Sequence, residues 1–135
     1  MFLSAVLLTK ATPTPTQVEA LQVLATAQAT LANDRSARLT TLATDRAAIP
    51  AVREADEVTI TADLTKVRTD RGNPSLVLAD ELQLRTDRAE LLLDVHTDTV
   101  QLATDTRTTN QQILADTRAV TIARLQYLRD VRLHL

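Results

Sequence analysis

Apolar residues recur along the chain in steps that keep them on one face of a helix. The steps are mostly of seven and eleven residues, and both lengths are close to whole numbers of turns at 3.6 residues per turn. A pure seven-residue repeat produces a left-handed supercoil and a pure eleven-residue repeat a right-handed one, so the mixture predicts long, nearly straight helices. The stripe consists of Leu31, Leu42, Ile60, Val67, Leu84, Leu91, Leu102 and Ile113.

Prolines and the single glycine set the limits of the predicted helices. The alternating prolines at 13 and 15 favour extended backbone, and Thr16 followed by Glu19 fits a capping box. Gly72 suits the left-handed position after a helix end, and Asn73 before Pro74 suits the cap and first turn of the next helix. The sequence therefore predicts an apolar arm with a Thr/Pro linker over 1–15 and one helical domain over 16–135, with helices at 16–71 and 74–134.

Two helices of similar length joined by a tight turn predict an all-α fold, a long antiparallel hairpin. Pro50 lies inside the first helix, where it predicts a kink or a brief break between residues 48 and 50. The alternative is a nearly continuous bent helix with a joint at Gly72–Pro74.

Charged residues keep fixed offsets from the apolar stripe. Eleven of the twelve aspartates follow a Leu, Ile, Val or Tyr by three residues, and ten of the thirteen arginines follow a Leu, Ile or Val by four. On a helix these offsets place aspartate on one flank of the stripe and arginine on the other. Ion pairs between flanks are predicted to involve Asp34, Asp45, Asp87, Asp105, Arg35, Arg46, Arg88 and Arg118.

The flanks also bear on how the helices associate. Opposite flanks meet when helices run parallel, whereas like flanks meet in an antiparallel pair. A hairpin within one chain therefore brings like charges together. Parallel neighbours from other chains would relieve this repulsion, and a two-helix hairpin buries little on its own. We expect the chain to associate with itself in a coiled-coil-like bundle of several chains.

Composition excludes several classes of function. The 135 residues include no cysteine and one glycine, which excludes disulfide scaffolds, cysteine metal sites and glycine-rich phosphate loops. A net charge of −2 gives no general attraction to nucleic acid. His96 and His134 lack partners at a metal-binding spacing, and no serine has a recognisable base. We therefore expect no enzyme, no cofactor, no metal and no catalytic residue.

Repeated apolar-x-x-Asp-Thr patterns, at Val95–Thr99 and Leu102–Thr106, resemble those of helical stalks in phage virion and bacterial surface proteins. The resemblance implies a non-enzymatic structural protein that forms a bundle, filament, stalk or shell, in a virion or at a cell surface rather than in the cytoplasm. Its partner would be itself, with other structural proteins as further candidates.

Two alternative functions stay open. Eleven-residue helical repeats also resemble those of apolipoprotein-like and desiccation-protection proteins, which implies a lipid-surface protein. Apolar residues among the arginines near the C-terminus fit such a surface or a partner's groove. The third reading is a helical adaptor for one specific protein partner. Residues 1–11 are either an arm or a processed signal.

Overall fold

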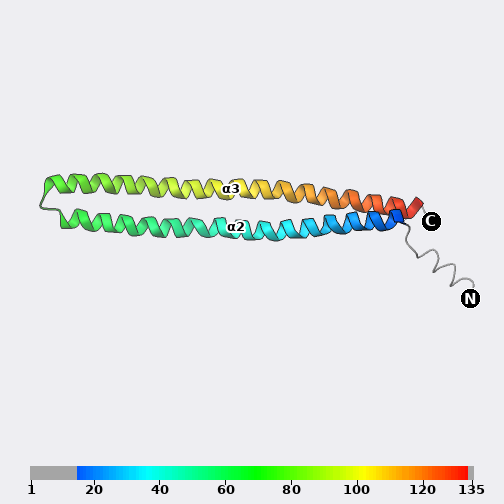
Figure 1. Cartoon of the computed structure of the whole chain (residues 1–135). Coiled ribbons are helices and arrows are strands. Elements are labelled where there is room, and N and C mark those ends of the chain that lie inside the picture. The colour runs from blue at the N-terminus through cyan, green and yellow to red at the C-terminus, as the bar shows by residue number, and fades with distance from the viewer. Residues whose placement is uncertain (1–14, 134–135) are drawn as a thin grey trace, which may run out of the picture. The chain divides into compact units, whose positions relative to one another are not determined.

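Two helices account for nearly all of the described chain. The structure, a computed structural model, describes residues 15–133 and consists of α2, Pro15–Thr69, and α3, Pro74–Leu133. They form a hairpin, shown in Figure 1 with the turn coloured green. The predictions of an all-α fold and a hairpin are confirmed. The predicted arm and linker lie outside the described residues, apart from Pro15.

The N-terminus of α2 differs slightly from the prediction. The helix begins at Pro15, where a proline is tolerated because the first backbone N–H of a helix has no partner within it. Thr16 is therefore inside the helix, so it is not the cap residue that a capping box requires. At the other end α2 stops at Thr69, two residues before the predicted end.

Pro50 does not interrupt α2. The helix continues through it from Pro15 to Thr69, so the break that the sequence allowed does not occur. Proline removes one backbone hydrogen bond, but the turns on both sides retain theirs and the packing against α3 holds them in place.

The turn is made differently from the expectation for Gly72. The described residues include no glycine with a positive φ, so Gly72 is not in the left-handed conformation. Instead, the Asp70 amide donates to the Lys66 carbonyl at 2.9 Å and the Asn73 amide donates to the Asp70 carbonyl at 2.8 Å. These bonds carry the chain out of α2 through a tightened turn.

Asn73 caps α3 as the sequence predicted. The Leu76 backbone N–H donates to the Asn73 side-chain oxygen at 3.4 Å, and the Val77 N–H donates to the Asn73 carbonyl at 3.0 Å. Pro74 follows at the first helical position, where its missing N–H costs nothing.

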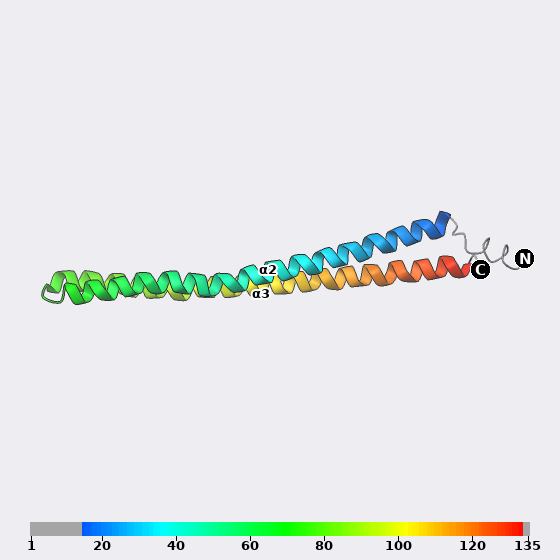
Figure 2. The same cartoon turned by 90° about the horizontal axis from the view of Figure 1, so that it is seen from below.

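Contacts divide the chain into two compact units, each containing a part of both helices. Unit 1 runs to Arg38 and resumes at Thr108, and unit 2 is Leu39–Arg107. Within unit 2, α2 and α3 run antiparallel from the turn, and Figure 2 shows them from a perpendicular direction. In unit 1 the segment of α2 that begins at Pro15 lies beside the end of α3.

Each unit has a small apolar core. The buried apolar residues of unit 2 are Leu42 and Leu84, and those of unit 1 are Val120 and Ala123. No large side chain in the described chain is fully buried, whereas Leu92 and Leu93 are 73% and 62% exposed. The hairpin thus leaves much of its apolar surface in contact with solvent.

Threonine hydroxyls are satisfied within their own helices. The side chains of Thr61, Thr97 and Thr106 donate to the carbonyl four residues earlier, at 2.8, 2.9 and 2.7 Å. These bonds offset the modest helix propensity of threonine and let the residue face solvent or the neighbouring helix without an unpaired hydroxyl.

Candidate functional site

Aspartates from the two helices face one another between α2 and α3. We call these facing pairs the aspartate ladder. One pair belongs to unit 1 and four belong to unit 2. The pairs are Asp34 with Asp116, Asp45 with Asp105, Asp56 with Asp94, Asp63 with Asp87, and Asp70 with Asp80.

The pairs follow one register along both helices. Starting from Asp34, the ladder advances along α2 by eleven, eleven, seven and seven residues. It runs backward along α3 from Asp116 by the same four steps. The matched steps explain why an antiparallel hairpin aligns every aspartate of the ladder with another aspartate.

The pair Asp63 and Asp87 is the most enclosed. Their exposed fractions are 5% and 8%, which is rare for charged side chains. The hydrogen bond to the Asp87 carboxyl raises the pKa of Asp63, and desolvation and the Asp87 charge raise it further, while Lys66 acts in the opposite direction. Because two carboxylates have no proton to donate, this hydrogen bond exists only when one carboxyl is protonated.

Similar causes act in the other four pairs. The hydrogen bond to the opposite aspartate is the largest factor that raises the pKa of Asp45, Asp80 and Asp116, followed by desolvation and the opposite charge. For Asp56 desolvation is the largest factor, and the hydrogen bond to Asp94 comes second. One member of each pair thus holds its proton more strongly than an isolated aspartate does.

In three of the pairs, a glutamine side-chain amide donates a hydrogen bond to one of the two aspartates. The side-chain NH₂ of Gln83 donates to Asp87 at 3.0 Å, and that of Gln101 donates to Asp105 at 3.0 Å. In unit 1 the amide of Gln112 on α3 reaches across to Asp34 on α2, also at 3.0 Å.

The opposite aspartates of these pairs differ. Oδ2 of Asp45, Asp63 and Asp116 is buried and receives no hydrogen bond from the described residues. In each of these three pairs, the aspartate opposite the amide-bound one is the member whose pKa is raised.

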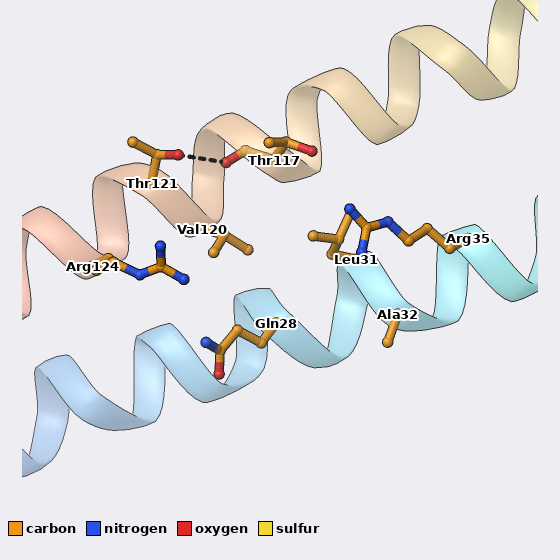
Figure 3. Close-up of a pocket in the computed structure, with 8 residues that line it drawn as sticks. All are labelled: Gln28, Leu31, Ala32, Arg35, Thr117, Val120, Thr121 and Arg124. Carbon is orange, nitrogen blue, oxygen red and sulfur yellow. Dashed lines mark hydrogen bonds between the residues drawn. The ribbon is translucent and has the colours of Figure 1, made fainter.

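Arginines lie on the other side of the apolar residues. In unit 1 a groove of about 380 Å³ runs between the helices, and Leu31 and Val120 lie at its centre. Figure 3 shows the guanidinium groups of Arg35 and Arg124 pointing into the space between the helices from opposite sides. Within the described chain neither arginine forms an ion pair. Arg35 and Arg124 thus line the same groove, one from each helix.

The predicted stripe lies between α2 and α3. Leu42 and Leu84 are buried and the other six members are partly buried. The contacts of the stripe with other chains remain a prediction, and so do the ion pairs between chains. Over residues 15–133 the one ion pair found joins the neighbouring residues Arg129 and Asp130 at 3.9 Å. Of the predicted aspartates, Asp34, Asp45, Asp87 and Asp105 all belong to the ladder.

The flank pattern predicts that like charges meet in an antiparallel hairpin, but it does not predict which aspartates face one another. The predicted ion pairs do not include the glutamines that donate to the ladder or six of its aspartates. These aspartates are Asp56, Asp63, Asp70, Asp80, Asp94 and Asp116. The signal was present in the sequence, because the steps between aspartates before the turn mirror those after it.

The described residues contain no group of three or more His, Cys, Asp or Glu side chains suited to a metal ion. No helix in residues 15–133 is long and apolar enough to span a membrane.

Comparison of the chain with protein-family models, with curated protein sequences and with solved structures finds no match in any of the three.

Proposed function

We propose that this chain is a non-enzymatic assembly protein that associates with copies of itself through its helical hairpin. The observation that carries the proposal is exposed surface. The described residues include sixteen large apolar side chains that are exposed, against four apolar residues that are buried. Such apolar surface is stabilised when a partner covers it.

Part of this surface forms a regular apolar row on α3. Leu82, Leu93 and Val100 are 56%, 62% and 48% exposed. Steps of eleven and then seven residues keep them on one face. This face is turned away from the apolar stripe, because each of the three lies two residues, about half a turn, from Leu84, Leu91 or Leu102. We call these three residues the outer row. The same step lengths pack α2 against α3, so the outer row suits a further helix of this chain.

Charge supports the same function. The arginines that line the groove in unit 1 have no acidic partner within the described chain, while exposed acids such as Glu54 and Glu57 lie on α2 in unit 2. Contacts between copies could pair these groups, which a single hairpin leaves apart. Such pairs would guide register more than they would add affinity.

The mass of the full chain in solution tests the proposal. Size-exclusion chromatography with light scattering, over a tenfold concentration range in the micromolar region, should give a multiple of 14.8 kDa or a mass that grows with concentration. A monomer throughout would refute self-association. If that monomer bound anionic vesicles, the lipid-surface alternative would replace it, because Leu125, Leu128 and Leu133 are exposed among arginines.

A further inference from the structure

We propose that the aspartate ladder is a proton-binding site, in which each facing pair holds one proton and the bound protons tighten the hairpin in mild acid. The inference goes beyond self-association, because it concerns contacts within one chain and does not require a second copy.

The charges around the ladder are almost entirely negative. In unit 2, Asp45 faces Asp105 and Asp98, and Asp56 faces Asp94, Glu90 and Asp87. Asp63 faces Asp87 and Asp80, Asp80 faces Asp70, and Lys66 acts on both Asp63 and Asp80. In unit 1, Asp116 faces Asp34. Lys66 is the one cation among these neighbours, so cationic side chains do not neutralise most of the ladder.

Burial increases the cost of leaving the carboxyls of the ladder without a neutralising cation. Asp63 is only 5% exposed, and its Oδ2 atom receives no hydrogen bond within the described chain. A buried oxygen of an ionised carboxyl without a donor is unfavourable, and a second carboxylate beside it adds repulsion. One proton relieves both problems, because it removes a charge and supplies the hydrogen that the two carboxyls share.

The glutamines support a count of one proton for each pair. Gln83 donates its amide hydrogen bond to Asp87, and Asp63 opposite is the member whose pKa is raised and which is suited to carry the proton. The same division applies to Asp45 opposite Asp105, where Gln101 donates.

The sign of the pH dependence follows from the raised pKa values. An aspartate whose pKa is higher in the folded chain than in the unfolded chain takes up its proton on folding. Its stabilising effect is complete below the unfolded value of about 3.9 and is lost as the pH rises through the folded value. The hairpin should therefore be more stable in mild acid than at neutral pH.

Thermal unfolding of the full chain, followed by far-ultraviolet circular dichroism at one fixed concentration, tests the proposal. The wild-type midpoint should be higher near pH 4.5 than near pH 7.5, by about 5 °C or more. In the triple variant Asp45→Asn, Asp63→Asn, Asp116→Asn, each amide supplies an N–H to the opposite carboxyl at every pH. Its midpoint at pH 7.5 should rise toward the acid value and its pH dependence should shrink, because only the pairs Asp56–Asp94 and Asp70–Asp80 still take up a proton.

A matched control removes three charges elsewhere. Glu19, Glu54 and Glu57 are exposed, and like the three aspartates they include one residue of unit 1 and two of unit 2. The variant Glu19→Gln, Glu54→Gln, Glu57→Gln should keep the wild-type pH dependence. If its pH dependence shrank as well, net charge would be the cause and the proposal would fail.

Other results would also overturn the proposal. A wild-type midpoint that is equal or higher at pH 7.5 would exclude proton uptake on folding. Stabilisation at pH 7.5 by millimolar CaCl₂, without any by acid, would assign the pairs to a divalent cation. If the asparagine variant does not fold, a pH titration of the wild-type aspartate carboxyls, followed by their carbon-13 chemical shifts, tests the proposal instead. Five carboxyls should titrate above the ordinary aspartate range, and a uniform ordinary titration would refute the ladder.

Discussion

Asp63 and Leu42 have nearly the same exposed fraction, 5% and 4%, yet they stabilise the hairpin under different conditions. Leu42 contributes by removing apolar surface from water, which depends little on pH. Asp63 contributes only when a proton is available to the pair that it forms with Asp87. Burial alone therefore does not measure what a residue adds to this fold.

Removing Leu42 should be costly, because few other side chains fill the core of unit 2. We expect Leu42→Ala to lower the free energy of unfolding by about 2–3 kcal/mol in urea denaturation. Leu39→Ala is the control, since Leu39 is 69% exposed on the same helix, and its effect should stay within about 0.5 kcal/mol. Equal losses for the two variants would contradict the placement of the core.

Gly72 is not required for the turn. Its φ is not positive, and a Cβ atom built on it would meet nothing within 4 Å. Gly72→Ala should therefore raise the free energy of unfolding by about 0.4–1 kcal/mol, because alanine restricts the unfolded chain. Denaturant melts of the two proteins measure this change, and a loss of stability would indicate a left-handed residue.

At the scale of the helices, sequence patterns defined most of the fold. The prolines, the Asn73 cap and the apolar stripe gave both helices to within two residues, and the tight turn gave their antiparallel order. The sequence did not predict that α2 continues through Pro50 without a break. Helix propensity takes no account of the neighbouring helix, which holds the turns on both sides of the proline together.

The facing pairs of the ladder were harder to infer than the meeting of like flanks. The offset of three residues from the stripe gives the side of the helix on which an aspartate lies, but not the residue opposite it. That residue depends on the register of α2 against α3, which the turn sets.

The cap of α3 offers a prediction at this scale. Asn73→Ala removes the side-chain oxygen that accepts the Leu76 N–H, and should lower the free energy of unfolding by about 0.5–2 kcal/mol. The control is Asn110→Ala at an exposed position inside α3, where alanine is the better helix former and no loss is expected. Similar losses in calorimetry would argue against the cap.

At the scale of the whole molecule, many apolar side chains of the described residues are exposed, and the outer row of α3 is a regular part of this surface. Leu82→Glu with Leu93→Glu places charges on this row, and should reduce the mass in light scattering to that of a smaller assembly or a monomer. Helix content in circular dichroism should remain, since both side chains are exposed.

A control for the outer row uses α2 of the same unit. Leu39 and Val58 are 69% and 67% exposed, so Leu39→Glu with Val58→Glu adds the same charge away from the row. This variant should keep the wild-type mass. Dissociation of both variants alike would mean that charge, rather than the outer row, governs assembly.

The mirrored steps of the ladder restrict how the chain can change in length. A deletion of eleven residues from one helix, for example 46–56, would place Asp45 opposite Asp94 and Asp34 opposite Asp105, and would leave Asp116 without a facing aspartate. The same deletion opposite it in the other helix, 94–104, would restore the original partners of the pairs that remain. Paired edits of seven or eleven residues on both arms therefore change the length of the hairpin without leaving any aspartate of the ladder without a facing partner.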